Sequence, residues 1–452
     1  MMSELLTVVL AAGKGTRMKS DTNKVLHKVA GKEMVNHVID TADKISSKVI
    51  CIVGHQADDV KENITADVSF ELQSEQLGTG HAVMQARNEI ENHSGDVLIL
   101  YADIPLIKEN TLRNMRKFHD DQSANLTIMT TLLKNSTGYG RIIKNENSEI
   151  IKIVEEDDAT FKEKKIKEIN SGIMCINSNS LIKALDDLDN DNAQDEYYLT
   201  DVVDTVRDEK GKILSYQIDD EEEITGVNDR VNLSKAEKTI RERINKEHMM
   251  NGVTIIDPLT TYIDENVEIG ADTIIYPFTY IEGETKIGSH NIIKPHNHII
   301  NTKIGDHNNI KNSNVIKEST IKNECNIGPF AHIRPGCIIA DGVKIGDYVE
   351  IKKADIKEKA KVPHLAYVGD AEIGSQTNVG AGTIFANYDG ENKHKTIIGN
   401  SVFIGSNSTL VAPLNIKNRG KTGAGAVVTR DVEEDTTVIG VPAREYIENK
   451  DG

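Results

Sequence analysis

A glycine-rich segment, Ala11-Ala12-Gly13-Lys14-Gly15-Thr16-Arg17-Met18, follows the apolar run at residues 6–10. Glycines let main-chain N–H groups approach an anion closely, and Lys14 and Arg17 bring positive charge to the same turn. The spacing is neither the GxxxxGKS/T of P-loop proteins nor the GxGxxG of dinucleotide-binding folds. A plain tight turn is the alternative for such a segment taken alone. We interpret it as a phosphate-binding loop that is not of the Walker type.

Asp103 lies just after the apolar run at residues 97–100, where a buried strand is expected to end. A carboxylate in that position suits a divalent cation that bridges phosphate oxygens. Mg²⁺ is the expected ion, because it prefers a few protein oxygens together with phosphates. Taken singly, Asp103 before Ile104-Pro105 can also be read as a turn residue.

The segment from residue 3 to about residue 207 alternates between apolar runs and stretches of helical spacing. The runs at residues 6–10, 49–53 and 97–100 predict buried strands, and residues 34–45 and 81–90 predict helices. Strands and helices that take turns along the chain indicate an α/β domain with a mostly parallel, Rossmann-like sheet.

Residues 251–452 carry apolar side chains at every sixth position in three runs. The runs are Ile263, Ile269, Ile275, Ile281, Ile287, Ile293, Ile299; then Ile327, Ile333, Ile339, Ile345, Ile351; then Ile398, Ile404, Leu410, Ile416, Thr422, Val428. An even step places these side chains on one side of each strand, so we expect them to stack into one column of a solenoid. The expected corner residues are Gly270, Gly288, Gly305, Gly328, Gly346, Gly374, Gly399 and Gly405. A meander of hairpins is the alternative, but it would need a turn dipeptide between each pair of strands.

Between these halves, residues 229–250 predict a helix with Leu233, Ala236, Ile240 and Ile244 on one face. We therefore expect a first domain at residues 1–228, a linker helix at 229–250 and a second domain at 251–452.

Several short motifs follow one another in an order that resembles the bifunctional bacterial N-acetylglucosamine-1-phosphate uridylyltransferase and glucosamine-1-phosphate N-acetyltransferase family. They are residues 10–18, 24–27, 73, 76–81, 139–141, 154–155, 169–172 and 226–228, and the resemblance covers nearly the whole chain. One departure is Ala102 before Asp103, where the family usually has glycine. The resemblance implies a nucleotidyltransferase domain followed by a left-handed parallel β-helix of hexapeptide repeats, and the handedness comes from the family alone.

In the first domain the resemblance implies transfer of UMP from UTP to N-acetylglucosamine 1-phosphate, with release of pyrophosphate. Arg17 is expected to ease the departure of pyrophosphate, and Lys24 to position the nucleophile. Asp103 and Asn228 are the expected Mg²⁺ ligands, although Asn228 alone also reads as a helix cap. The expected nucleotide- and sugar-binding residues are Leu10, Ala11, Ala12, Gly13, Lys24, Gln73, Gly78, Thr79, Gly140, Glu155, Asn170 and Asn228. The acidic residues 156–158 that follow Glu155 are interpreted as surface.

A second site is expected where the six-residue period breaks, at residues 359–367 and 385–393, because a regular solenoid offers few pockets. His364 lies in the first break. An imidazole that titrates near neutrality suits removal of a proton from a sugar amine, so His364 is the expected general base. The other histidines of the repeat region are expected to be surface residues at coil corners: His290, His296, His298 and His307.

The resemblance supplies the remaining residues of this site, where acetyl-CoA would acetylate glucosamine 1-phosphate. The expected sugar-phosphate residues are Arg334, Lys352, Tyr367, Asn378 and Lys393. The expected acetyl-CoA residues are Ala381, Asn387, Tyr388, Ser406, Ala424 and Arg444. Lys352 beside Lys353 can also be read as a solvated pair. Together the two reactions would make UDP-N-acetylglucosamine, a cell-wall precursor.

Composition limits the partners of the chain. Its 452 residues include 53 basic and 71 acidic ones, a net charge of −18, which argues against nucleic acid or an anionic membrane as partner. The four cysteines show no C-x-x-C spacing, and no signal peptide or membrane-spanning stretch is apparent, so we expect reduced thiols in a cytoplasmic protein. The resemblance adds a homotrimer that binds small molecules.

Two rival interpretations share this layout. A nucleoside-diphosphate-glucose pyrophosphorylase would keep the first domain and use the solenoid as a regulatory platform. A non-catalytic assembly subunit, as in certain translation-factor exchange complexes, would have lost the glycine-rich loop and Asp103, and both are present.

Overall fold

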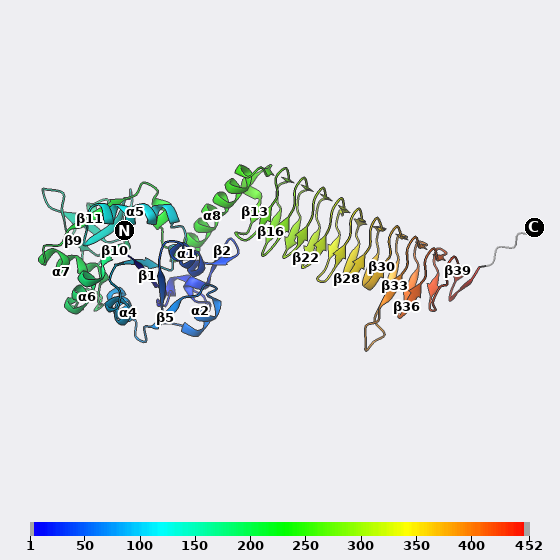
Figure 1. Cartoon of the computed structure of the whole chain (residues 1–452), viewed down its shortest axis with the longest axis horizontal. Coiled ribbons are helices and arrows are strands. Elements are labelled where there is room, and N and C mark those ends of the chain that lie inside the picture. The colour runs from blue at the N-terminus through cyan, green and yellow to red at the C-terminus, as the bar shows by residue number, and fades with distance from the viewer. Residues whose placement is uncertain (1–3, 447–452) are drawn as a thin grey trace, which may run out of the picture. The chain divides into compact units, whose positions relative to one another are not determined.

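The computed structural model describes residues 4–446 (Figure 1). Its contacts divide the chain into two compact units, Met1–Ile240 and Arg241–Gly452. The division falls inside the helix α8 (Arg230–Met250).

A mixed sheet forms the centre of the first unit, with the strand order β11-β7-β10-β6-β1-β4-β5 and with β8 and β9 attached beside β10. The strands are β1 (Leu5–Leu10), β4 (Lys48–Val53), β5 (Ser69–Leu72), β6 (Asp96–Tyr101), β7 (Leu126–Leu132), β8 (Arg141–Lys144), β9 (Ile150–Val154), β10 (Glu168–Asn177) and β11 (Ile213–Gln217). β1 pairs in parallel with both β4 and β6, whereas β10 runs antiparallel to its neighbours β6 and β7. The three predicted apolar runs are β1, β4 and β6, which lie side by side.

Helices cover both faces of this sheet (Figure 1). They are α1 (Met34–Asp43), α2 (Ala57–Asn63), α3 (Thr79–Met84), α4 (Arg87–Glu91), α5 (Glu109–Asp121), α6 (Ser178–Asp187) and α7 (Val202–Asp208). Alternate side chains of β1 enter opposite cores: Leu6 and Val8 pack on one face, and Leu5 and Val9 on the other. This double burial explains why the strand reads as an unbroken apolar run.

The single helix predicted at residues 81–90 is instead two short helices, α3 and α4. The Gln85 side chain donates to the His81 carbonyl at 2.8 Å. In a continuous α-helix this carbonyl would instead accept the hydrogen bond from the Gln85 backbone N–H. The Gln85 backbone N–H turns to the Ala82 carbonyl at 3.2 Å, so the helix tightens and ends there.

The second unit is a left-handed parallel β-helix of short strands, from β12 (Thr254–Ile255) to β40 (Ala443–Glu445). Paired residues lie one coil apart, 18 residues in Ile263↔Ile281 and 17 in Ile287↔Ile304. The predicted single column is therefore wrong. Residues six apart occupy three successive strands of one coil, so the inward side chains form three columns, which contain the pairs Ile263–Ile281, Ile269–Ile287 and Ile275–Ile293.

The solenoid continues through two places where the sequence pattern is lost. Ile304, Ile310, Ile316 and Ile321 fill the gap between the first two runs, and the phase changes there because some corners are one residue shorter. The predicted break at residues 359–367 is also wrong, because Val362 and Val368 point inward at 0% exposure. The break at residues 385–393 is real: after Phe385 the next inward apolar residue is Ile398, and a loop before β33 (Thr396–Ile398) projects from the coils (Figure 1).

The recurrence of glycine along the solenoid has a different cause from the one predicted. Of the eight expected corner glycines, only Gly328 has a positive φ, at 87°. A Cβ on Gly346 would lie 1.6 Å from the Pro363 carbonyl oxygen of the next coil, so close approach between coils requires glycine there. The corners themselves use non-glycine residues with positive φ, among them His290, His296 and His307. His298 is not at a corner: it lies in β19 (His298–Ile300) and contacts Glu282 at 2.9 Å.

α8 covers the first coil with its C-terminal half. Asn245, which is fully buried, donates from its side chain to the carbonyls of Pro258 and Thr261 at 2.9 and 3.0 Å. At the other end of the solenoid, β39 (Thr437–Gly440) and β40 form an antiparallel hairpin over the last coil. Both edges of the parallel sheets are thus covered.

Two further expectations concern the chain as a whole. All four cysteines are free and buried. Among the described residues, no helix is long and apolar enough to cross a membrane.

We expect Ile339→Ala to lower the free energy of unfolding of the solenoid by about 2–5 kcal/mol, because it leaves a cavity in a packed column. Its neighbour Ile338 is a matched control on the same strand, β26 (Ile338–Ile339), with 46% exposure against 0% for Ile339. Ile338→Ala is expected to cost about 0.5 kcal/mol or less. Urea denaturation followed by circular dichroism measures both losses, and equal values would contradict the inward assignment of Ile339.

Candidate functional site

The glycine-rich loop lies at the carboxyl end of β1 and lines a cavity of about 380 Å³. Gly15 has a φ of 59°, and a Cβ there would lie 2.5 Å from the Cβ of Lys24. Glycine at this position therefore permits both the turn and the close packing of Lys24 against it. The cavity brings together eleven of the predicted residues: Leu10, Ala11, Ala12, Gly13, Lys14, Lys24, Gln73, Gln76, Gly78, Thr79 and Asp103.

Asp103 also lines an adjoining cavity of about 280 Å³ that contains Arg17 and Asn228. The Asp103 carbonyl accepts from Val227 N–H at 2.8 Å, so the backbone itself holds Asn228 beside Asp103. Lys24 Nζ donates to Asp103 Oδ2 at 2.5 Å and to Asn228 Oδ1 at 3.3 Å, and Arg17 Nη2 donates to the same Asn228 oxygen at 2.8 Å. The structure thus unites the four residues predicted to handle metal and phosphate.

Asp103 and Asn228 fit a Mg²⁺ ion by two criteria. Both offer oxygen donors, the chemistry that Mg²⁺ prefers, and one ammonium group already contacts both oxygens. The described residues contain no group of three or more His, Cys, Asp or Glu side chains placed to hold a metal. A site here would accordingly take its remaining ligands from phosphate and water.

Ala102, which replaces the usual glycine, is fully buried and its N–H donates to the Leu10 carbonyl at 3.0 Å. Ala102 belongs to the core that also contains side chains of α1 and α5, and it lines neither cavity. The departure from the family therefore leaves both cavities unobstructed.

Gln73 is held in one orientation at the far side of the first cavity. Its Nε2 donates to the Gly78 carbonyl at 3.0 Å and lies 3.1 Å from His81 Nδ1, and the side chain is 3% exposed. This arrangement engages Nε2 and leaves Oε1 available as an acceptor at the cavity that Gln73 lines. Gly78 has a φ of 110° and lies against Tyr197, so a side chain there would strain the turn.

Gly140, Glu155 and Asn170 meet where β8, β9 and β10 pair. A Cβ on Gly140 would lie 3.2 Å from Glu155 Oε2, and Asn170 N–H donates to the Gly140 carbonyl at 2.9 Å. Asn170 Oδ1 accepts from Gly172 N–H at 2.9 Å, which directs its amide group outward as a donor. Burial raises the pKa of Glu155, and the neighbouring carboxylates of Asp158 and Asp157 add to that effect.

Glu156 is more than a surface residue, contrary to the sequence interpretation. Its Oε2 accepts from Arg141 Nη2 at 2.8 Å and from Gly138 N–H at 3.1 Å. Arg141 is only 1% exposed, so Glu156 neutralises a buried guanidinium. This role could not be predicted from the sequence, because a run of acidic residues has the same pattern whether or not one of them pairs with a buried cation.

On the solenoid, His364 Nδ1 contacts Asp347 Oδ1 at 2.6 Å. A hydrogen bond from its own backbone N–H and the contact with His364 hold the pKa of Asp347 below its usual range. The two residues are register partners on neighbouring coils, in β27 (Lys344–Asp347) and β29 (Lys361–His364). The carboxylate therefore fixes the ring through Nδ1, and Nε2 is the ring nitrogen not engaged in this contact.

The same column continues beyond His364 with small side chains. The N–H groups of Leu365, Gly382, Asn407 and Gly425 bond to the carbonyls of Asp347, His364, Ala381 and Ser406 respectively. Each step moves up one coil, so one column contains Asp347, His364, Ala381, Ser406 and Ala424 in that order. The predicted acetyl-CoA residues Ala381, Ser406 and Ala424 thus extend in line from the histidine.

Cations gather on the next face of the same coils. Arg334 and Lys352 are neighbours on adjacent coils, and Arg334 pairs with Glu350 at 2.8 Å. Lys393 returns from the projecting loop to Lys352, and contact with that ammonium lowers the pKa of Lys393. Two like charges held together in this way favour an anion between them.

Gly369 marks the floor of this group. A Cβ there would lie 2.6 Å from the hydroxyl oxygen of Tyr367 and 2.7 Å from Asn387 Nδ2, so both side chains pass directly over it. Asn387 is fixed by donating to Asp370 Oδ2 at 2.5 Å. Tyr367 and Asn387 therefore converge above Gly369, whose register partner on the preceding coil is Lys352.

Three predicted residues lie apart from this group. Asn378, in β31 (Asn378–Val379), is the register partner of Lys361 rather than of Tyr367. Tyr388 is 59% exposed in the projecting loop, where its hydroxyl donates to the Gly390 carbonyl. Arg444 lies in β40, beyond Ala424 at the end of the solenoid.

Asp347 and Asp370 are site residues that the sequence interpretation missed. Each lies 17 residues before the side chain that it contacts, His364 and Asn387. Because one coil has 17 or 18 residues, an acidic residue one coil before a predicted site residue is the signal that would have found them.

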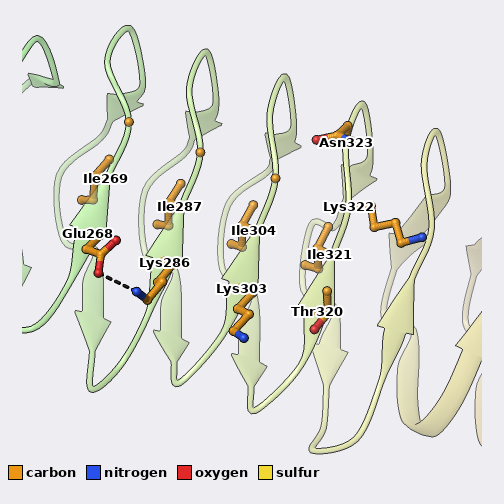
Figure 2. A pocket seen from close by; sticks show the side chains of 13 residues that line it. Glu268, Ile269, Lys286, Ile287, Lys303, Ile304, Thr320, Ile321, Lys322 and Asn323 are labelled. Carbon is orange, nitrogen blue, oxygen red and sulfur yellow. Dashed lines mark hydrogen bonds and ion pairs between the residues drawn. The ribbon is translucent and has the colours of Figure 1, made fainter.

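A separate groove of about 610 Å³ lies on the N-terminal coils (Figure 2). Its floor is open because Gly270, Gly288 and Gly305 lack side chains, and Lys286 at its rim pairs with Glu268 at 2.6 Å. None of the predicted site residues lines this groove. We therefore do not assign catalysis to it.

Comparisons with known proteins agree with the two units. Residues 7–195 match the MobA-like NTP transferase domain, and residues 318–353 match the bacterial transferase hexapeptide with six repeats. A Clostridioides difficile protein named "Bifunctional protein GlmU" is 48% identical over 446 residues, 98% of this chain and 96% of that protein. Proteins of the same name from Acetivibrio thermocellus and Listeria monocytogenes are 47% and 46% identical over 439 and 452 residues, covering 97% and 100% of this chain and 95% and 98% of theirs.

The acidic cluster behind Glu155 makes a pH-dependent contribution to stability. Burial and the carboxylates of Asp204, Asp189, Glu155 and Asp158 raise the pKa of Asp201 to about 6 from 3.8. Ionised Asp201 therefore destabilises the folded chain, with no cost below pH 3.8 and the full cost above pH 6. We expect Asp201→Asn to stabilise the chain by about 1 kcal/mol at pH 7.5, allowing for partial exposure, and by less at pH 5.

Thermal unfolding at the two pH values measures this effect. Asp208→Asn, which removes an exposed carboxylate paired with Arg207, is the control and is expected to show no such stabilisation at pH 7.5. An identical gain from Asp201→Asn at both pH values would contradict the assigned cause.

Proposed function

Because this chain belongs to the bifunctional GlmU family, we propose that its two sites catalyse successive steps in the synthesis of UDP-N-acetylglucosamine. The chain is both a nucleotidyltransferase and an acyltransferase. The solenoid acetylates glucosamine 1-phosphate from acetyl-CoA, and the first unit joins the product to UMP from UTP. The product serves cell-wall synthesis in the cytoplasm.

One observation carries the assignment of the acetyl step: the column of Asp347, His364, Ala381, Ser406 and Ala424 beside the paired cations Lys352 and Lys393. A base, an anion site and a strip of small side chains are the parts needed to bring an amino sugar phosphate to a long thioester. A solenoid with only a regulatory role, as in the pyrophosphorylase rival, needs none of them together.

In the acetyl step, His364 Nε2 takes a proton from the sugar amine as the amine attacks the thioester carbonyl. The tetrahedral adduct then collapses, the C–S bond breaks, and coenzyme A leaves as the thiol after taking the proton from His364. Asp347 keeps the ring in the tautomer that can accept this proton. Arg334, Lys352 and Lys393 grip the phosphate of the sugar, with Tyr367 as a further contact. Ala381, Ser406 and Ala424 make room for the pantetheine arm, Asn387 and Tyr388 meet the acetyl group, and Arg444 contacts the phosphates of the coenzyme.

In the uridylyl step, the phosphate of N-acetylglucosamine 1-phosphate attacks the α-phosphorus of UTP. Gln73 Oε1 accepts from the uracil N3–H, and the Gly78-Thr79 backbone reads the same edge. Gly140, Glu155 and Asn170 bind the hydroxyls and acetamido group of the sugar. Lys24 and Arg17 neutralise the phosphates, so that the anionic reactants can approach each other and pyrophosphate can leave.

Asp103 and Asn228 would hold Mg²⁺, which when bound supplies positive charge at the α-phosphate. We further propose that the protein is a homotrimer in which the projecting loop with Asn387 and Tyr388 serves the acetyl site. The trimer is proposed from the family. The loop between Phe385 and Ile398 leaves the coils of its own chain, which is compatible with a loop that serves a site in an oligomer.

The two activities are expected to separate by mutation. His364→Ala should reduce acetyl transfer by about 10²–10⁴-fold, because the general base is lost, and leave uridylyl transfer unchanged. Asp103→Asn should do the reverse. Thiol release from acetyl-CoA and pyrophosphate release from UTP measure the two steps, and His307→Ala, at an exposed corner, is the histidine control. Loss of both activities from either single mutation would contradict independent sites.

Asp347 should act on the acetyl step only through His364. Asp347→Asn is expected to lower kcat by about 10- to 10³-fold, because an amide can hold the ring in the wrong tautomer. The KM for glucosamine 1-phosphate should change by less than about threefold, since Asp347 is not among the residues proposed to grip the sugar. A rise in KM with kcat unchanged would show that Asp347 binds substrate instead.

A further inference from the structure

The ammonium group of Lys24 lies on the two side chains proposed as metal ligands. Its Nζ is 2.5 Å from Asp103 Oδ2 and 3.3 Å from Asn228 Oδ1. Arg17 Nη2 donates to the same Asn228 oxygen at 2.8 Å. Cations of the chain itself therefore already bind both oxygens.

The base of the Lys24 side chain is fixed by the backbone around it, whereas its ammonium is held by contacts with two side chains. Lys24 begins the short helix η2 (Lys24–Leu26), whose cap Asn23 accepts from Val25 N–H at 3.1 Å and donates to the His55 carbonyl at 2.7 Å. The Cβ of Lys24 packs against Gly15 of the phosphate loop. From this position a lysine can turn its ammonium toward Asp103 or toward an anion in the loop, because Lys24, Asp103 and the loop line one cavity.

For electrostatic reasons, each of the two positions of the Lys24 ammonium suits a different ligand. An ammonium on Asp103 disfavours a divalent cation there, whereas an ammonium turned to the loop favours an anion. The Lys24 and Asp103 side chains are 15% and 16% exposed, so solvent screens their charges only partly. A divalent cation at Asp103 would meet the like charges of Lys24 and Arg17 at close range. A triphosphate removes this conflict, because its oxygens offer both side chains charge-assisted hydrogen bonds.

We propose that Lys24 and Arg17 occupy the metal ligands of the free enzyme and release them when a nucleoside triphosphate binds, so that nucleotide and divalent ion bind with positive coupling. The inference rests on the uridylyl-transfer function proposed for this unit. Lys24 thus has two successive partners, first Asp103 and then phosphate. Because coupling between two ligands is reciprocal, the ion also tightens binding of the nucleotide.

Binding of Mn²⁺ to the full-length protein without nucleotide, followed by electron paramagnetic resonance, tests this inference. Lys24→Met keeps the aliphatic stem and removes the charge, and it should tighten Mn²⁺ binding by about tenfold or more. Adding Asp103→Asn to Lys24→Met should abolish the gain. Lys14→Met is the matched control, because Lys14 lines the same cavity without a described bond to Asp103 or Asn228, and it should change Mn²⁺ binding by less than about threefold.

A measurement on the unmodified protein is independent of the folding of any variant. UTP in the presence of EDTA should bind detectably by calorimetry, because Lys24 and Arg17 can turn to its phosphates without the ion. The inference is overturned if the unmodified protein binds Mn²⁺ alone as tightly as Lys24→Met does, or if Lys14→Met gives the same gain. If Mn²⁺ binds no variant, with or without UTP, the proposed metal site itself fails and the inference fails with it.

Discussion

Neutralisation of negative charge is the constraint on which both sites depend. The chain carries a net charge of −18, yet each proposed substrate is an anion. Attraction must therefore come from a few local cations rather than from the overall field. Both sites keep such a cation paired with a carboxylate of the chain, Lys24 with Asp103 and Arg334 with Glu350. Pairing avoids uncompensated charge before a substrate arrives, and in the proposed mechanism an incoming phosphate replaces the carboxylate as partner.

The two units place these groups by different geometric means. In the first unit the carboxyl ends of the parallel strands β1 and β6 lie side by side, so the glycine-rich loop and Asp103 meet at one edge of the sheet. In the solenoid, side chains are brought together by lying one above another in a column of successive coils, rather than at one edge of a sheet. Asp347, His364 and Ala381 are neighbours only because each is one coil from the next. The corner between His364 and Tyr367 then sets the proposed base beside the face proposed to bind phosphate.

Sequence reasoning reached the fold class, the apolar strands and helix α8, because these depend on long periodic patterns. It failed where the spacing of residues in the sequence does not reveal which side chains point inward or touch. Shortened corners hid Ile304 to Ile321, and valines at 362 and 368 looked like a break in the period although they point inward. The family resemblance named the residues that the cavity at the glycine-rich loop brings together, but not their partners. Asp347, Asp370 and Glu156 act through contacts across coils or into a buried arginine, and no local spacing encodes such contacts without knowledge of the coil length.

The coil length also bears on the order in which the sites can form during synthesis of the chain. The His364–Asp347 pair closes a loop of 17 residues, whereas Asp103 and Asn228 are joined only after a separation of 125 residues, 228 − 103. Contacts of low sequence separation form early, and a solenoid can nucleate at any coil and grow from it. A ribosome must deliver nearly all of the first unit before its nucleotide cavity can be completed, but each new coil of the solenoid can dock as soon as it emerges. β proteins usually have a high contact order and fold slowly, but the contacts of this solenoid are local. Its low contact order thus favours early folding of the β-rich half of this chain.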